Sequence, residues 1–244
     1  MAEPEATWSE EDSRTFIDLA DVAVPGRREQ MDVVLSLVPA AEDDEFAVAD
    51  LACGEGLFAR LLLERYPRAH LTAFDGSETM LARAAERLSP FGERARVLPF
   101  DLAARDWLAE LPEGMRVITS SLAVHHLEDV AKAALYRELA GKLAPGGALI
   151  IADVVEPVNA AARRAVISAW HAIACEQSLA LSGSEALYRQ AVNEGWAPPA
   201  DDEPVPGEMP APLFRHLQWL KAAGLSSVDC FWLRAGIAIY GGYR

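Results

Sequence analysis

Short apolar runs alternate with amphipathic segments through the middle of the chain. Runs rich in Val, Leu, Ile and Ala predict buried strands, and segments with apolar residues every three or four positions predict helices between them. The predicted strands are residues 46–51, 70–75, 95–100, 115–120 and 147–153, and the predicted helices are 56–66, 77–88 and 129–143. Strands that alternate with helices are typical of a parallel sheet covered by helices.

The two ends of the chain depart from this alternation. A Ser9 N-cap followed by three acidic residues predicts a helix over 9–20, and Pro25-Gly26 separates it from a second helix through 31–37. After Asp153 the alternation stops, and the remaining elements are two or three helices over 157–195, a Pro-rich acidic connector over 196–212, a helix over 213–223, and two β-rich runs, Ser227–Leu233 and Gly236–Tyr243. The two runs predict a closing hairpin.

The connector contains six prolines and no helical or alternating period. They are Pro198, Pro199, Pro204, Pro206, Pro210 and Pro212. With 244 residues the chain is long enough for one α/β domain with an elaboration, and too short for two full domains. The predicted fold is Rossmann-like: a seven-stranded, mostly parallel sheet with one antiparallel strand in the C-terminal hairpin, N-terminal helices, and a helical insertion after the fifth strand.

The first predicted strand ends in a glycine-rich turn, Asp50-Leu51-Ala52-Cys53-Gly54-Glu55-Gly56. The glycines let the backbone bend sharply and let a ligand lie against the main chain. The next strand ends in Asp75, about twenty residues downstream, where a carboxylate suits the two hydroxyls of a ribose. The pattern predicts a nucleoside-containing cofactor across the carboxyl ends of the strands.

Two cofactors fit a turn of this kind. Gly54-x-Gly56-x-x-Ala59 matches a loose dinucleotide fingerprint, which would bind NAD. Asp50 favours S-adenosylmethionine (SAM), because an acid inside the turn repels a pyrophosphate and suits an ammonium group. Asp101, after the third strand, is placed to accept a hydrogen bond from an adenine amino group. We therefore expect SAM.

Five segments strengthen this expectation by their order. DLACGEG, FDGS, FDLA, SSLAVHHLED and LAPGGALIIAD together resemble the class I SAM-dependent methyltransferases, over roughly residues 46–153 and again at the C-terminus. Val24-Pro25-Gly26 and the late insertion are similar in layout to the branch of carboxy-SAM synthases and small-molecule methyltransferases. The resemblance implies transfer of the SAM methyl group to a small organic acceptor.

The candidate cofactor-binding residues follow from these motifs. They are Arg27, Asp50, Ala52, Cys53, Gly54, Gly56, Asp75, Gly76, Ser77, Met80, Asp101, Leu102, Ser120 and Ser121. Met80 is placed to cover an adenine face. In the branch that the chain resembles, a basic residue near the Val-Pro-Gly turn holds the methionine carboxylate, which makes Arg27 the candidate here.

His125 and His126 follow the fourth predicted strand and are the candidate catalytic residues. Imidazole titrates in the range useful to a general base, which methyl transfer needs only when the acceptor must lose a proton. The alternatives are that both histidines line the pocket, or that one faces the acceptor and the other caps the helix near Asp129. Neither has a metal-ligand partner at helical spacing, so no metal site is expected. Further candidates for the acceptor pocket are His171, Tyr188, His216 and Tyr240.

Composition limits the class of acceptor and the location that we expect for the protein. The formal net charge is −15 with no cluster of Lys and Arg, which disfavours a nucleic-acid substrate. Three scattered cysteines, an acidic N-terminus and no apolar run of membrane-spanning length predict free thiols, no membrane partner and a cytoplasmic location. Five of the six tryptophans lie outside residues 46–153, which suggests an aromatic cavity for a small acceptor: Trp8, Trp170, Trp196, Trp219 and Trp232.

The sequence is thus interpreted as one SAM-dependent methyltransferase domain of four parts. These are an N-terminal helical cap (1–45), a cofactor-binding core (46–156), a helical insertion or lid (157–212), and a last helix with a hairpin (213–244). The alternatives are a carboxy-SAM synthase, for which Tyr188-Arg189 would supply the extra carboxylate site, a tRNA-modifying methyltransferase, and a SAM-binding protein without catalysis. The acceptor, the methylated atom and the oligomeric state stay open.

Overall fold

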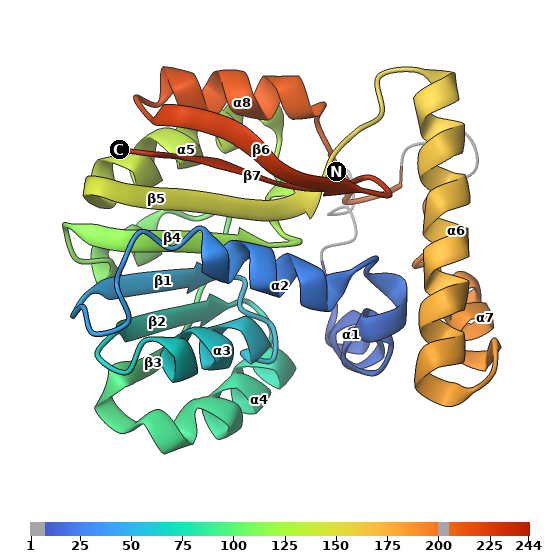
Figure 1. The fold of residues 1–244 in the computed structure, drawn as a ribbon, viewed down its shortest axis with the longest axis horizontal. Coiled ribbons are helices and arrows are strands. Elements are labelled where there is room, and N and C mark those ends of the chain that lie inside the picture. The colour runs from blue at the N-terminus through green and yellow to red at the C-terminus, as the bar shows by residue number, and fades with distance from the viewer. Residues whose placement is uncertain (1–7, 200–204) are drawn as a thin grey trace, which may run out of the picture.

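The structure is a computed structural model that describes residues 8–199 and 205–244 (Figure 1). Predictions for residues 1–7 and 200–204, Pro204 among them, lie outside the described residues. Within the described part of the chain, one seven-stranded sheet has the order β3-β2-β1-β4-β5-β7-β6. Its strands are β1 (Ala47–Leu51), β2 (His70–Asp75), β3 (Ala95–Pro99), β4 (Met115–Ser121), β5 (Leu143–Val154), β6 (Ser226–Arg234) and β7 (Ile237–Tyr243).

The pairing of the strands gives the sheet its polarity. β1 pairs in parallel with both β2 and β4, β2 with β3, and β4 with β5. β7 runs antiparallel to β5 and to β6. The predicted Rossmann-like fold, with one antiparallel strand in the C-terminal hairpin, is confirmed. The strand order reverses between β1 and β4, and ligands in such sheets bind outside the carboxyl ends of the strands at that point.

Helices cover both faces of the sheet. They are α1 (Glu10–Ala23), α2 (Arg27–Ser36), α3 (Leu57–Arg65), α4 (Glu78–Leu88), α5 (Asp129–Lys142), α6 (Ala160–Ser182), α7 (Ala186–Asn193) and α8 (Leu213–Ala222), with 3₁₀ turns at Ser89–Arg94, Asp106–Glu110 and Val124–His126. One core cluster joins the sheet to α2 and α3, and another joins it to α5 and α8. None of the described helices is long and apolar enough to cross a membrane.

The strands form where the sequence is continuously apolar. Val48, Ala49 and Leu51 of β1 and Ile150 and Ile151 of β5 are essentially inaccessible to solvent, because both strands are sandwiched between helices. Because both faces of β1 and β5 are buried, neither strand alternates between polar and apolar residues, and both are continuous apolar runs in the sequence.

The strand β5 begins earlier than predicted. The sequence predicts a Pro-Gly-Gly turn before residue 147, whereas β5 starts at Leu143, which pairs with Met115 before the register shifts. The backbone of Arg244 exchanges hydrogen bonds with Gly146 and Gly147, at 2.8 and 2.9 Å. The C-terminal residue therefore converts the expected turn into an irregular start of the strand.

The first helix and the insertion pack against each other beyond the carboxyl ends of the parallel strands. In Figure 1, α1, α6 and α7 lie together to one side of the sheet, past the strand arrowheads. The indole nitrogen of Trp170 donates to Ala23 O at 3.0 Å, and Gln177 joins α6 to the turn after α1 by accepting from Gly26 N at 2.8 Å. Two helices that are far apart in the sequence, α1 and α6, thus form one wall.

Candidate functional site

A large cavity of about 1250 Å³ lies at the carboxyl ends of β1, β2, β4 and β5. Ligand pockets commonly occupy about 300–1,000 Å³, so this cavity has room for two molecules. The predicted site residues that line it are Arg27, Asp50, Ala52, Cys53, Gly54, Asp75, Gly76, Ser77, Met80, Asp101, Leu102, Ser120, Ser121, His125 and His126. Of the residues predicted to bind the cofactor or to act in catalysis, Gly56 alone lies outside this wall.

The glycine-rich turn is held in place by the next strand. Gly54 N donates to Asp75 Oδ2 at 2.8 Å, and Cys53 N donates to Phe74 O at 2.8 Å. Ala52 has a φ of 55°, in the left-handed region that side chains with a Cβ rarely adopt. Strained backbone of this kind is concentrated at functional sites. The turn is thus rigid and presents its backbone to the cavity.

Gly56 has a packing role. It is the N-cap of α3 with a φ of 75°, and a Cβ there would lie 3.2 Å from the Cα and Cβ of Ala84 in α4. A side chain would therefore separate α3 from α4. The direct cofactor contact that the sequence suggests for Gly56 is not supported by its position.

Asp50 and Ser120 supply buried polar atoms that lack partners. Asp50 Oδ1 accepts a hydrogen bond from Thr119 Oγ1 at 3.0 Å, while Asp50 Oδ2 and Ser120 Oγ have no partner among the described residues. Burial raises the pKa of Asp50 to about 7. A buried carboxylate without a compensating cation is costly, so the site suits a ligand with an ammonium group. This donor set fits the amino acid part of SAM.

Asp75 is oriented by the start of α4. Its carboxylate accepts from Gly54 N and, at 3.0 Å, from Ser77 N, and burial raises its pKa. Ser77 is also the N-cap of α4, accepting from Met80 N at 3.2 Å. The predicted ribose acid, helix cap and adenine-covering methionine therefore form one connected unit.

Glu10 completes this unit from the first helix, and sequence analysis placed no function on it. Its carboxylate accepts hydrogen bonds from Glu78 N at 2.9 Å, Thr79 N at 3.0 Å and Ser77 Oγ at 3.1 Å. These contacts satisfy amides at the N-terminus of α4 and lower the pKa of Glu10. The pattern of Ser9 and three acids signals only a local helix start, because the partners of Glu10 lie 67 to 69 residues away.

Arg27 lines the cavity as predicted, and acids already hold its guanidinium. It contacts Asp21 at 2.8 Å and Glu55 at 3.6 Å, and lies 5.7 Å from the ring of Phe16. Its assignment to the methionine carboxylate stays a prediction.

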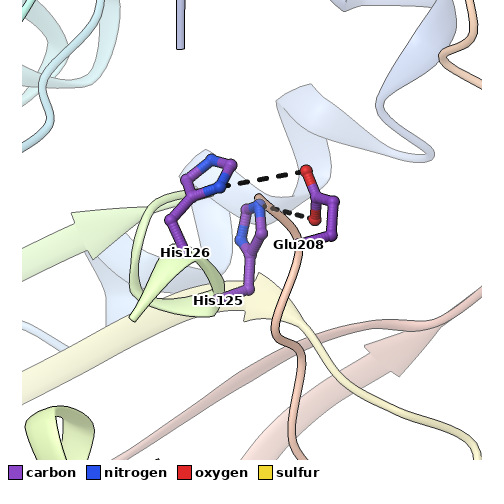
Figure 2. Close-up of side chains that lie close together, drawn as sticks. All are labelled: His125, His126 and Glu208. Carbon is purple, nitrogen blue, oxygen red and sulfur yellow. Dashed lines mark ion pairs between the residues drawn. The ribbon is translucent and has the colours of Figure 1, made fainter. Parts of the chain in front are cut away.

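His125 lies between the carboxylates of Asp153 and Glu208, and Figure 2 shows its contact with Glu208. Its Nδ1 donates to Asp153 Oδ1 at 2.5 Å, its Nε2 is 3.2 Å from Glu208 Oε2, and its backbone N donates to Asp153 Oδ2 at 2.8 Å. Burial alone would lower the pKa of His125, but the two carboxylates outweigh it and raise the pKa to about 10. The same ion pair keeps the pKa of buried Asp153 below its usual value. His125 is therefore a fixed imidazolium near neutral pH.

His126 has the opposite electrostatic character. Burial, followed by the positive charge of His125, lowers its pKa. Its Nδ1 lies 2.9 Å from Gly207 O, and a carbonyl oxygen only accepts, so Nδ1 carries the proton and Nε2 holds the free lone pair. Figure 2 shows Nδ1 turned toward Glu208 and the other ring nitrogen turned away from it. His126 is thus a neutral base with a defined tautomer.

The two histidines and Glu208 also form a possible metal-ligand set. Their donor atoms lie within 4.8 Å of one another, which the spacing of the histidines in sequence does not predict. In this structure the same atoms are used in contacts within the protein, because His125 Nε2 faces Glu208 and His126 Nδ1 faces Gly207 O. The cluster is accounted for by hydrogen bonds and ion pairs.

Aromatic rings from distant segments line the part of the cavity next to His126. The ring centroids of Trp8 and Phe16 are 5.7 Å apart, those of Trp8 and Trp196 5.9 Å, and those of Phe16 and Trp196 5.5 Å. Trp8 is also 6.2 Å from the ring of His126. We call Trp8, Phe16 and Trp196 the aromatic cluster. The predicted aromatic cavity is present, although only three of the five tryptophans (Trp8, Trp170 and Trp196) line it.

Comparison with known proteins identifies the part of the chain that carries the cofactor motifs. Residues 48–147 match the family model described as a methyltransferase domain. This part of the chain is a class I SAM-dependent methyltransferase domain. The match covers the turn after β1, the acid after β2 and both histidines.

The relatives of this methyltransferase domain match it over part of their length. A trans-aconitate 2-methyltransferase of Acidovorax sp. (strain JS42) is 35% identical over 153 residues, which are 58% of this chain and 54% of the relative. An uncharacterized methyltransferase of Mycobacterium tuberculosis (strain ATCC 25618 / H37Rv) is 38% identical over 111 residues, 45% of this chain and 51% of the relative. The chain spans about half the length of the curated relatives it matches.

The fold likeness extends further than the sequence likeness. An O-methyltransferase family protein from Burkholderia thailandensis superposes with a TM-score of 0.65 at 18% identity, over 100% of this chain and 65% of that one. At this identity the superposition establishes the fold.

Four further candidates for the acceptor pocket of the methyltransferase do not line the cavity. His171 Nδ1 and Tyr188 OH lie 3.0 Å apart between α6 and α7. His216 and Tyr240 belong to a buried hydrogen-bonded group with Tyr136, with atom pairs 2.7 to 3.1 Å apart. These polar side chains stabilise the packing of helices and sheet, which a sequence pattern does not distinguish from a pocket.

Two other expectations are also corrected. Neither histidine caps α5, because its N-cap is Glu128 and no side chain caps it. Arg189 is exposed and pairs with Glu185 at 2.9 Å, so Tyr188-Arg189 forms no carboxylate site in the cavity. The carboxy-SAM synthase alternative thereby loses the residues on which it depended.

Besides Glu10, the candidate site residues that the sequence did not indicate are Glu208 and Asp153. Asp153 ends an apolar strand and was interpreted only as the end of that strand. Glu208 lies in the Pro-rich connector, a segment without periodicity. Only the fold brings it to the histidines, through hydrogen bonds from Met209 N to His125 O at 2.9 Å and from Lys132 Nζ to Met209 O at 2.5 Å.

Proposed function

We propose that the protein transfers the methyl group of SAM to a small organic acceptor whose reacting group must lose a proton. The observation that carries the proposal is the continuity of one cavity. Its wall joins the glycine-rich turn and Asp75 on one side to His126 and the aromatic cluster on the other. A cofactor and an acceptor can therefore lie in contact within one cavity.

The protein contributes orientation more than covalent chemistry. Bound SAM supplies an electrophilic methyl group on a sulfonium centre. The rigid turn, the acids at the strand ends and the aromatic wall hold two molecules in fixed relation and exclude water. Orientation of this kind lowers reaction barriers by up to roughly 7–11 kcal/mol in favourable systems.

His126 is the residue that we assign to proton removal. Because its Nδ1 is held by Gly207 O, its Nε2 is available to accept a proton from the acceptor. His125 cannot do this near neutral pH, because both of its nitrogens are protonated and face carboxylates. We assign His125 to positioning, since it fixes the connector that carries Gly207 and Glu208.

The proposed cofactor contacts are the sequence-predicted ones that line the cavity. Asp75 is assigned to the ribose and Asp50 to the ammonium group of SAM. Asp101 is assigned to the adenine. The relatives named trans-aconitate 2-methyltransferase support a small acceptor, and they do not favour carboxy-SAM synthesis or tRNA modification.

The test is transfer of an isotope-labelled methyl group. The protein is incubated with SAM labelled on the methyl carbon and with a panel of small acceptors of several chemical classes. The proposal predicts a labelled product one methyl group heavier than an acceptor, together with S-adenosylhomocysteine (SAH). Binding of SAM without transfer to any class of acceptor would instead support the non-catalytic alternative.

A further inference from the structure

The aromatic cluster contains one buried polar atom that no described residue contacts through a hydrogen bond. Trp196 Nε1 is buried and has no hydrogen-bond partner among the described residues. Three other indoles of the chain are satisfied, since Trp8 Nε1 donates to Ser13 Oγ at 2.7 Å, Trp107 Nε1 to Ala104 O at 2.9 Å and Trp170 Nε1 to Ala23 O at 3.0 Å. A buried donor without a partner costs about 1–3 kcal/mol, so Trp196 is the exception that needs a cause.

The position of Trp196 supplies the cause. Trp196 lines the cavity, and its ring contacts Trp8 and Phe16, which line the same wall. Indole Nε1 is a donor only, so its partner must be an acceptor atom such as an oxygen. The atom that satisfies it is therefore expected to come from a molecule bound in the cavity.

The surrounding wall limits what that molecule can be. Next to the aromatic cluster the cavity is lined by apolar side chains of α6, including Val166 and Ile167, and by Met209 of the connector. The charged residues of this part of the wall are of both signs, since Glu156 and Arg163 line it and Glu208 is paired with His125, so the described lining offers no cluster of cations to hold a polycarboxylate. Flat rings pack favourably against an aromatic wall.

We propose that the aromatic cluster is the acceptor subsite and that it selects a flat, uncharged hydroxyaromatic molecule. An oxygen of this molecule accepts a hydrogen bond from Trp196 Nε1, and its ring packs against Trp8 and Phe16. This rests on the proposed function, and it assigns an acceptor class other than the tricarboxylate in the names of the relatives. Trp196 is then the specificity-determining residue.

The test separates the ring of Trp196 from its N–H group. SAH-loaded protein is titrated with 1-naphthol and with naphthalene, which has no oxygen, and binding is followed by ligand-observed NMR. Trp196→Phe keeps an aromatic ring and removes the donor. We expect 1-naphthol to bind about tenfold more weakly to this variant, the factor of one net hydrogen bond, and naphthalene to bind equally to both proteins.

The matched control is Trp219→Phe, because Trp219 lies outside the cavity wall and contacts Arg215 at 5.0 Å. It should change neither ligand's affinity, and both variants should keep wild-type affinity for SAH. The proposal is overturned if Trp196→Phe affects the two ligands equally, or if 1-naphthol does not bind while trans-aconitate is methylated. In that second case methyl transfer itself stands. If SAH does not bind the wild-type protein, the proposed function is wrong, and the subsite proposal that rests on it is wrong as well.

Discussion

The two sides of the cavity are built in different ways. The cofactor side is made of turns that directly follow β1, β2 and β4, and its groups are backbone amides and acids fixed by their own neighbours, as when Gly54 N donates to Asp75. The acceptor side is assembled from α1, α6 and the connector, which meet only in the folded protein. The family match covers residues 48–147, which include the cofactor side and the two histidines but none of α1, α6 or the connector. The comparison shows that the cofactor site is specified by local motifs at the ends of strands, whereas the acceptor site is specified by contacts between segments far apart in the sequence.

The largest expected effect is a loss of turnover on the acceptor side without a loss of cofactor binding. His126→Ala removes the proposed base from the acceptor side, so kcat should fall by roughly 10²–10⁴ while the affinity for SAM stays unchanged. Steady-state kinetics and calorimetry measure the two quantities. His70→Ala, an exposed histidine of β2, is the control and should leave both unchanged. Near-normal turnover of His126→Ala would mean that orientation alone carries the chemistry.

The next effect concerns the ion pair that joins the sheet to the acceptor side. Asp153→Asn leaves the His125 imidazolium buried without its closest counter-ion, and breaking a buried pair costs about 3–5 kcal/mol of unfolding free energy. Urea unfolding measures the loss. Glu113→Gln breaks the exposed pair with Lys142 and should cost no more than about 1 kcal/mol. Equal losses in the two variants would contradict the charged state assigned to His125.

A smaller effect is expected on the cofactor side. Asp75→Ala removes the proposed ribose contact and should weaken SAM binding by roughly 1.5–3 kcal/mol, the contribution of hydrogen bonds to a charged group. Calorimetry measures the affinity, and Asp32→Ala on the exposed face of α2 is the control. If Asp75→Ala binds SAM as the wild type does, the cofactor lies elsewhere.

A further effect is a dependence of stability on pH. The pKa of His125 is about 10 in the folded protein and near its ordinary value of 6.5 in the unfolded chain. The folded protein therefore binds the His125 proton more tightly than the unfolded chain does, and protonation stabilises the fold. Its contribution is complete below pH 6.5 and is lost as the pH rises toward 10. Thermal unfolding at a series of pH values should show a melting temperature that declines over this interval. Replacing Glu208 by Gln removes one of the carboxylates that raise this pKa, so the decline should end at a lower pH and be smaller in total.

Prediction from sequence succeeded where local signals decide. The glycine turn, the acids after the strands and the helix starts depend on residues close together in sequence, so β1 and the residues that follow it were placed correctly. The fold follows from the same signals, because continuous apolar runs and short turns restrict the topology. The early start of β5 was missed, since it depends on Arg244, about a hundred residues away.

The acceptor side could be predicted only in outline. An excess of tryptophans outside the core suggested an aromatic cavity, but no pattern selects Trp196 over Trp219, because burial of an indole nitrogen is a property of the fold. Glu208 lies in a segment without period, and Glu10 resembles any acid in a first helical turn. The division of the chain into cap, core, lid and hairpin stays a prediction, as do the cytoplasmic location and the individual roles of the site residues.

The most direct test of the account is a pair of titrations on the wild-type protein. Calorimetry with SAH and with NAD, under identical conditions, asks whether the rigid turn and the buried Asp50 select a sulfonium-derived nucleoside over a pyrophosphate. The account predicts saturable heat with SAH, at a roughly micromolar dissociation constant (about −8 kcal/mol), and none with NAD. Saturable binding of NAD with no heat from SAH would contradict it.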